Sequence, residues 1–255
     1  MSKSLFLKKY SRLLNGRPLV VAVVTEKFFN EPSFINRLKK EVFADVLELR
    51  LDSFSFIHGN THAAILLSQF IIKKIKTNSR LPLLLTLRSY KECGVILPIE
   101  KRLSNEKREI FLTALLSRVD LVDLEIRETS FSQAMTQLAK KKGVAVIHSA
   151  HNFKNVGSLK DINSLVKKSL QFNGDIFKVA VTPKNQTELF NFLTWGKQLV
   201  HPHPVFIAMG KEGAPSRSIG YSFGSIFTYG HLGKASAPGQ FSSENLFSFT
   251  KEVYR

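Results

Sequence analysis

The sequence predicts an α/β fold, a single (β/α)8 barrel that spans residues 1–255. Eight short apolar segments typical of strands follow one another along the chain, and helix-length amphipathic segments separate most of them. The length of 255 residues is also the usual size of such a barrel. A doubly wound open sheet is the alternative, but no glycine-rich dinucleotide turn follows the first strand.

The strand segments are leucine-rich or β-branched runs that end at charged or turn-forming residues. We expect strands at 19–25, 45–52, 81–88, 119–126, 143–149, 175–181, 204–210 and 222–229. Apolar residues at helical spacing predict helices at 32–43, 60–76, 103–117, 129–141, 159–171 and 184–199. The seventh gap has room for one turn near Ser216, and a last helix is expected after a cap at Ser242 or Ser243. No Pro/Gly/Ser-rich linker divides the chain.

Composition predicts a cytoplasmic globular protein. Hydrophobic residues make up 44% of the chain, and the single cysteine, Cys93, excludes an internal disulfide framework and suits a reducing compartment. No apolar run approaches the roughly 20 residues that span a bilayer, so we expect no membrane partner. The N-terminus is basic and then apolar, but Glu26 follows closely and no small-residue cleavage site is present, so we expect a first strand and not a signal peptide.

The chain is strongly basic, with 37 Lys and Arg against 20 Asp and Glu and a formal net charge of +17. Such a charge is compatible with nucleic acid, an anionic membrane surface or a small anionic substrate. The basic residues fall in short scattered clusters, mostly where helix faces would meet solvent. Charge by itself therefore does not choose among these partners.

Lys178 interrupts an apolar run in the stretch "GDIFKVAVT", residues 174–182. Burying an ammonium group costs several kcal/mol unless it is paired or loses its proton. In one interpretation the lysine lies on an edge strand and extends its amine to water. In the other, burial favours the neutral amine, which then acts as a nucleophile. From this stretch alone both interpretations remain open.

Charged and polar residues collect where the predicted strands end. Glu48, Arg50 and Asp52 alternate along the second strand and therefore share one face, while the leucines between them share the other. Later strand exits supply Thr86, Arg88, Glu92, His148, His151, Lys178, Arg217, Ser236 and Gln240. Because barrel active sites form at the C-terminal ends of strands, we expect these side chains to meet at one mouth.

Four of the seven histidines form two closely spaced pairs. His201 and His203 precede the seventh strand, at the opposite end of the barrel, and no cysteine or third ligand recurs nearby, so we expect no metal site. His148 lies within the fifth strand and is expected to pack inward or against a helix as a structural residue. His151 is expected in the loop beyond that strand, where catalytic groups collect.

This set of side chains suits one kind of chemistry. An amine can form an imine with a ketone, which acidifies the neighbouring C–H bond, and a histidine can take that proton and return it to a leaving oxygen. Arginines pair with a carboxylate, while Glu, Ser and Gln bind hydroxyls. The set predicts a polyhydroxylated keto acid as substrate, and either β-elimination of water or a retro-aldol cleavage.

At these residues the sequence resembles the type I 3-dehydroquinate dehydratases of the shikimate pathway, which leads to the aromatic amino acids. Six motifs carry the resemblance in order along most of the chain: "ELRLD", "TLRSYKECG", "SAHNF", "DIFKVAV", "MGKEGAPSR" and "ASAPGQ". It implies a lyase without a metal or organic cofactor, and a homodimer. The product would be 3-dehydroshikimate.

The resemblance also implies residue roles. Lys178 would form the Schiff base, His151 would move the protons, and Glu92 would orient its imidazole. Glu48, Arg50 and Arg88 would line the side of the ring hydroxyls. Arg217 and Gln240 would bind the carboxylate, and Ser236 would lie on a loop that closes over the substrate. Two positions depart from the family pattern, since Cys93 stands where glycine is usual and Asn152 where aspartate is common.

Two alternatives remain at this point. A Schiff-base aldolase or transaldolase barrel also uses a lysine on the sixth strand, but it typically needs a phosphate site. A basic nucleic-acid-binding protein would explain the charge, yet the sequence contains no recognised nucleic-acid motif and no aromatic residues interleaved with a basic stripe.

Overall fold

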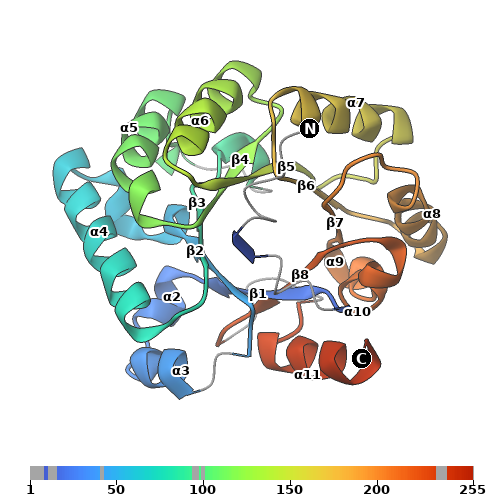
Figure 1. Cartoon of the computed structure of the whole chain (residues 1–255), viewed down its shortest axis with the longest axis horizontal. Helices are drawn as coiled ribbons and strands as arrows, with labels where there is room; N and C mark the ends of the chain where they lie inside the picture. Colours follow the sequence, from blue (N-terminus) through green and yellow to red (C-terminus); the bar gives the residue numbers. More distant parts are fainter. Residues whose placement is uncertain are drawn as a thin grey trace.

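Eight parallel strands form a ring at the centre of the molecule, with helices around it (Figure 1). The structure is a computed structural model that describes residues 9–10, 16–40, 43–93, 98, 101–233 and 240–254. The strands are β1 (Leu19–Val24), β2 (Val46–Arg50), β3 (Leu83–Thr86), β4 (Leu121–Glu125), β5 (Ala145–Asn152), β6 (Ile176–Val181), β7 (Pro204–Ala208) and β8 (Phe227–His231). Their order is β7-β6-β5-β4-β3-β2-β1-β8, and the Ile226 N–H donates to Pro204 O at 2.9 Å, which brings β8 against β7. The fold is the predicted TIM barrel.

The longer helices cover the outside of the ring (Figure 1). They are α3 (Phe34–Lys40), α4 (Thr61–Asn78), α5 (Asn105–Leu115), α6 (Thr129–Lys141), α7 (Leu159–Gln171), α8 (Gln186–Gly196) and α11 (Ser243–Val253). One-turn helices are α2 (Glu26–Phe29), α9 (Gly210–Gly213) and α10 (Ser216–Ile219). Side-chain caps start several of the longer helices, and the predicted cap Ser242 accepts from the Asn245 N–H at 3.1 Å.

Alternation along the strands divides the barrel interior into an apolar and a polar half. Val46 and Leu84, near the strand starts, belong to the buried interior cluster, whereas Glu48 and Thr86, two residues further, are buried polar groups. The same change from apolar to polar occurs on β4, β5 and β6. The C-terminal ends of β2, β3, β4, β5 and β6 therefore carry the polar mouth, as predicted, whereas the inward residues of β1 and β7 stay apolar.

The outward faces of the strands hold the helices. Leu47 and Leu49 on β2 pack in the large apolar cluster together with Ile71 and Ile75 of α4. This confirms the predicted division of β2 into a leucine face and a charged face. At the other end of the barrel, Lys9 Nζ donates to Gly143 O at 3.1 Å.

All eight strands differ from their predicted bounds by at least one residue. β8 begins at residue 227, because residues 220–223 form a 3₁₀ helix that ends at Gly224, whose φ of +102° is left-handed. β2 ends at Arg50, so Asp52 lies in the 3₁₀ helix η2 (Leu51–Ser53), and β3 ends before Arg88. β5 instead continues to Asn152, because it pairs with β6 as far as Val181. The sequence predicted His151 in the loop beyond the strand. That prediction is wrong, because His151 lies within β5.

No helix in the described ranges is long and apolar enough to cross a membrane. Within the same ranges, no three His, Cys, Asp or Glu side chains come together as a metal site.

Candidate active site at the C-terminal mouth of the barrel

Lys178 lies in the middle of β6, between β5 and β7, and its side chain is 5% exposed. Its Nζ donates to Oδ2 of Asp123 at 2.9 Å and lies 4.5 Å from the centroid of the Tyr229 ring. The edge-strand interpretation is thus wrong, because β6 is an interior strand of the ring. The amine is held inside the barrel by a carboxylate and an aromatic face.

Asp123 on β4 is the buried carboxylate of this site. Oδ1 accepts from Ser149 Oγ at 2.5 Å and from Arg88 NH1 at 3.1 Å. Burial by itself would raise the pKa of Asp123, but the positive charges of Arg88 and Lys178 hold that pKa well below its usual range. Asp123 is therefore a fixed negative charge beside the amine.

Of the two histidines of β5, His151 is the one that faces the interior. In the pairing of β5 with β6, Ser149 is opposite Lys178 and His151 is opposite Ala180, so the imidazole stands one inward position nearer the mouth than the amine. Burial, followed by the charges of Arg88 and Lys178, lowers its pKa well below the ordinary value, so the ring is neutral near pH 7. A neutral imidazole can accept a proton.

Glu92 fixes the orientation of that ring. Its Oε2 accepts from the backbone N–H of His151 at 2.9 Å and lies 3.0 Å from Nδ1. When Nδ1 carries the proton and donates to Glu92, the lone pair of the imidazole is on Nε2. Arg88 NH1 also lies 3.2 Å from Nδ1, although it has carboxylate partners at shorter range.

The second oxygen of Glu92 has a different neighbour. Oε1 is buried, lacks a hydrogen-bond partner in the described residues, and lies 3.6 Å from Nε of Arg127, whose side chain is 44% exposed. Burial, followed by the charge of Glu125, raises the pKa of Glu92 to about 7, while Arg88 and Arg127 act in the opposite direction. The charge of this carboxylate therefore changes near neutral pH.

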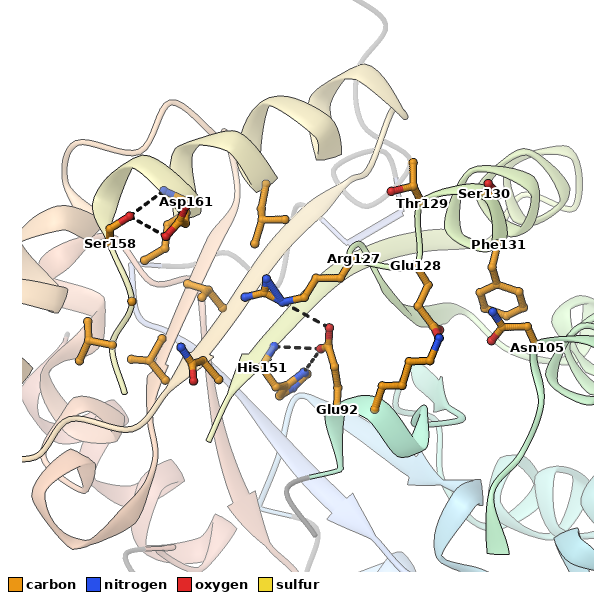
Figure 2. A pocket seen from close by; sticks show the side chains of 18 residues that line it. Glu92, Asn105, Arg127, Glu128, Thr129, Ser130, Phe131, His151, Ser158 and Asp161 are labelled. Carbon is orange, nitrogen blue, oxygen red and sulfur yellow. Dashed lines mark hydrogen bonds and ion pairs between the residues drawn. The ribbon is translucent and has the colours of Figure 1, made fainter. Parts of the chain in front are cut away.

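A cavity of about 720 Å³ opens beside the mouth, and both Glu92 and His151 line it. Figure 2 shows Arg127, Glu92 and His151 along it, with their contacts drawn as dashed lines. Ser158 and Asp161 line it from the start of α7. Lys178 is not part of its lining, so the cavity exposes the carboxylate and imidazole, not the amine.

Glu48 and Arg50 lie on the opposite side of the mouth. Glu48 is 3% exposed and accepts from Thr86 Oγ1 at 2.6 Å. Arg50 forms a two-bond ion pair with Asp52, at 3.0 and 2.8 Å, and its side chain is 31% exposed. Both side chains are on the interior face of β2, as expected from their alternation.

Arg217 lies on α10, next to the ends of β7 and β8. NH1 donates to Ala208 O at 3.0 Å, while Nε is buried and lacks a hydrogen-bond partner. In the part of the chain that the structure describes, no carboxylate pairs with it. Burial without an acidic neighbour lowers its pKa to about 10. Gln240 lines a small cavity with Arg217, whereas Ser236 lies outside the described residues.

His148 is structural, as predicted. It is fully buried on the outer face of β5, where Nε2 lies 2.8 Å from Thr136 Oγ1 of α6 and Nδ1 lies 3.0 Å from Ser169 Oγ of α7. A Cβ at Gly174 would come within 2.3 Å of Nδ1, so this contact also requires glycine there. The ring joins two helices to the sheet.

The second histidine pair lies away from the mouth, whereas the two departures from the family pattern, Cys93 and Asn152, directly follow Glu92 and His151 in the sequence. His201 and His203 are buried at the start of β7, at the far end of the barrel. Asn152 accepts from the backbone N–H groups of Lys154 and Asn155 and so orders the loop after β5.

Sequence reasoning missed the acidic residues of β4 and the aromatic residue of β8. Asp123 and Glu125 alternate along β4 just as Glu48 and Arg50 do along β2, so the same period-two signal was present. Tyr229 gives no such signal, because an aromatic residue in a strand is most often part of a core. It becomes notable only when the fold brings its ring beside Lys178.

Comparison with known proteins agrees with this geometry. The model of the family described as type I 3-dehydroquinase matches residues 20–254. The chain belongs to the type I 3-dehydroquinase family. The 3-dehydroquinate dehydratase of Klebsiella pneumoniae is 32% identical over 213 residues, 80% of this chain and 80% of the relative. That of Hydrogenobaculum is 29% identical over 236 residues, 91% of this chain and 96% of the relative.

Solved structures of 3-dehydroquinate dehydratases have the same fold. The Aquifex aeolicus enzyme matches with a TM-score of 0.78 at 27% identity, covering 93% of this chain and 99% of that chain. The type I enzyme of Clostridium difficile, solved with covalently modified comenic acid, matches with a TM-score of 0.79 at 25% identity, covering 94% of each chain. A putative aldolase domain from Bacteroides vulgatus, at 14% identity and a TM-score of 0.62, shares the fold alone.

Proposed function

We propose that this member of the type I 3-dehydroquinase family removes water from 3-dehydroquinate through an imine at Lys178 and releases 3-dehydroshikimate. Family membership makes the chain a 3-dehydroquinate dehydratase, a hydro-lyase of the shikimate pathway. The residue roles below are part of the proposal. The observation that carries them is the placement of Lys178 inside the barrel, paired with Asp123, one inward position below His151.

The first steps join substrate and enzyme. The Lys178 amine attacks the C3 ketone, and loss of water from the adduct gives an iminium ion. Asp123 is 2.9 Å from Nζ before the reaction, so its charge would stabilise the cation that persists after the imine forms. The Tyr229 ring offers its face to the same cation.

The proton transfers follow at His151. The iminium ion acidifies C2–H, and Nε2 of His151 takes that proton while Nδ1–H donates to Glu92. The resulting enamine expels the C1 hydroxyl, to which His151 returns the proton, so that water leaves. Hydrolysis of the conjugated imine then frees the product and restores Lys178.

The remaining side chains would bind the substrate. Glu48 and Arg50 would contact ring hydroxyls from β2, with Arg88 beside them. Arg217, which has no acidic partner among the described residues, would bind the carboxylate, with Gln240 next to it. Ser236 would close over the substrate from the preceding loop. No step of this scheme requires a metal or organic cofactor.

Borohydride trapping tests the scheme. The protein is incubated with 3-dehydroquinate and borohydride, and peptide mass spectrometry locates the reduced adduct, while the absorbance of the product enone follows water loss. We expect one adduct, at Lys178, and formation of enone without cleavage of a carbon–carbon bond. An adduct at another lysine, or aldol cleavage products, would contradict the proposal.

We also propose that the whole chain, residues 1–255, forms one catalytic domain that acts as a cytoplasmic homodimer. Leu66, Leu67 and Phe70 are exposed on α4 and Ile110 is exposed on the neighbouring α5, which supports an apolar contact face there. Sedimentation equilibrium of the wild type and of Phe70→Lys tests this. A wild-type monomer at micromolar concentration would contradict it.

A further inference from the structure

The last two inward positions of β8 carry polar groups that lack partners. Tyr229 and His231 are two residues apart on this strand, which Figure 1 shows between β1 and β7. Tyr229 Oη and His231 Nδ1 are both buried, and neither has a hydrogen-bond partner among the described residues. The same is true of Nε of Arg217. Buried polar atoms without partners are costly to a fold, so these three need an explanation.

The three side chains share a cavity. A space of about 40 Å³ is lined by Arg217, Tyr229 and His231, with Thr25 and Gln240 completing its polar wall. Its volume is about that of one carboxylate group or a water or two. Its lining contains a buried guanidinium and no carboxylate, and it therefore suits an anion.

We propose that Tyr229 Oη and His231 Nδ1 act with Arg217 as hydrogen-bond donors to the carboxylate of the substrate. The inference rests on the proposed function and adds two substrate-binding residues to it. A tyrosine hydroxyl donates while it is protonated, and burial, followed by the charges of Glu48 and Asp123, raises the pKa of Tyr229 well above its ordinary value. His231 donates in the tautomer that carries its proton on Nδ1.

Tyr229 also links this cavity to the amine of Lys178, which would react with the ketone carbon of the substrate. The centroid of its ring lies 4.5 Å from Lys178 Nζ, and the same side chain lines the cavity with Arg217. In 3-dehydroquinate the ketone carbon and the carbon that bears the carboxylate are separated by one ring carbon. A single side chain that contacts both the amine and the carboxylate would fix the substrate in the orientation that elimination requires.

Tyr229→Phe is the sharpest test, because it keeps the ring over Lys178 and removes only Oη. We expect the KM for 3-dehydroquinate to rise roughly tenfold, the effect of losing one hydrogen bond to a charged group, with kcat within about threefold of the wild type. Tyr221→Phe is the matched control, because Tyr221 precedes β8 at the opposite end of the barrel. Its KM should not change.

A second substrate separates carboxylate binding from an effect on the lysine. 4-Hydroxycyclohexanone has a ring ketone but no carboxylate, and we expect borohydride to trap its imine with Lys178. Its trapping rate should be equal in the wild type and Tyr229→Phe. His231→Leu should also raise the KM for 3-dehydroquinate and leave the trapping of 4-hydroxycyclohexanone unchanged. If thermal unfolding shows that Tyr229→Phe is not folded, the His231→Leu variant decides the question.

The outcomes are distinct. If the wild type forms enone and both variants keep its KM, Tyr229 and His231 do not bind the carboxylate and the proposed function stands. If trapping of the carboxylate-free ketone falls as much as turnover, the hydroxyl acts on Lys178 and the inference is overturned. If the wild type forms no enone from 3-dehydroquinate, it is the proposed function that fails.

Discussion

Oε2 of Glu92 contacts His151 twice, through the backbone N–H at 2.9 Å and through Nδ1 at 3.0 Å. The two contacts fix both the position of the residue and the rotation of its ring. Because Oε1 of Glu92 faces Arg127 at 3.6 Å, the charge of this carboxylate depends on a side chain that is partly exposed to solvent. The orientation of the imidazole thus depends on an ion pair at the edge of the mouth.

The pH dependence of kcat should reveal Glu92. The pKa of Glu92 is raised to about 7, and orientation of the imidazole through Nδ1–H requires the ionised carboxylate. We therefore expect kcat to fall as the pH drops through about 7. Arg127 lowers this pKa, so Arg127→Gln should move the acidic limb to higher pH, and Arg127→Lys should restore it. A limb that stays in place in Arg127→Gln would show that Arg127 has no influence on Glu92.

Lys178→Ala should abolish both turnover and borohydride trapping, because the described interior contains no second amine beside Asp123. Enone absorbance and mass spectrometry of the trapped protein measure the two effects. Lys141→Ala, an exposed lysine of α6, is the control and should behave as the wild type. Trapping of the Lys178→Ala protein at one other lysine would mean that the nucleophile is assigned wrongly.

The two histidines of β5 should differ sharply. His151→Ala is expected to reduce kcat by at least ~10²-fold, the usual effect of removing a general acid–base, while Lys178 still forms an imine. His148→Asn should keep kcat within about tenfold, because His148 contacts helices on the outer face. Steady-state kinetics of both variants decide the matter, with trapping as the check on Lys178. The reverse order of severity would refute the assignment.

Arg217→Ala should act mainly on substrate binding. A guanidinium–carboxylate contact is present both in the bound substrate and in the transition state, so we expect KM to rise by roughly 100-fold with a smaller change in kcat. Arg118→Ala, at an exposed position before β4, provides the control. An unchanged KM with a large loss of kcat would assign Arg217 to the transition state instead.

His148 should make stability depend on pH. Burial, followed by the charge of Lys140, lowers its pKa in the folded state to about 4, below the ordinary value of 6.5. The folded chain therefore binds fewer protons than the unfolded chain between these values, so the contribution is complete above pH 6.5 and is lost as the pH falls toward 4. This contribution to the free energy of unfolding is on the order of 3 kcal/mol. Denaturant unfolding should show a shallower pH dependence in His148→Asn, and equal slopes would contradict this.

Local periodicity was enough to predict the barrel and most of the candidate site. Eight apolar segments separated by amphipathic ones predict a (β/α)8 barrel, and the rule that catalytic groups gather at strand exits selects Glu48, Arg88 and Lys178. Boundaries were less accurate. The start of β8 was placed too early, since Phe223, in the 3₁₀ turn that ends at Gly224, extends the aromatic pattern of the strand toward its N-terminal side.

The sequence by itself determined which chemical groups reach the mouth, and the tertiary structure decided how they are paired. Lys178 and Asp123 are 55 residues apart, and His151 and Glu92 are 59 apart, so no local pattern connects them. Strand alternation depends on neighbouring residues along the chain and can be inferred from sequence. The charge state of a buried group depends on residues from several strands, and only the closed ring of strands brings those residues together.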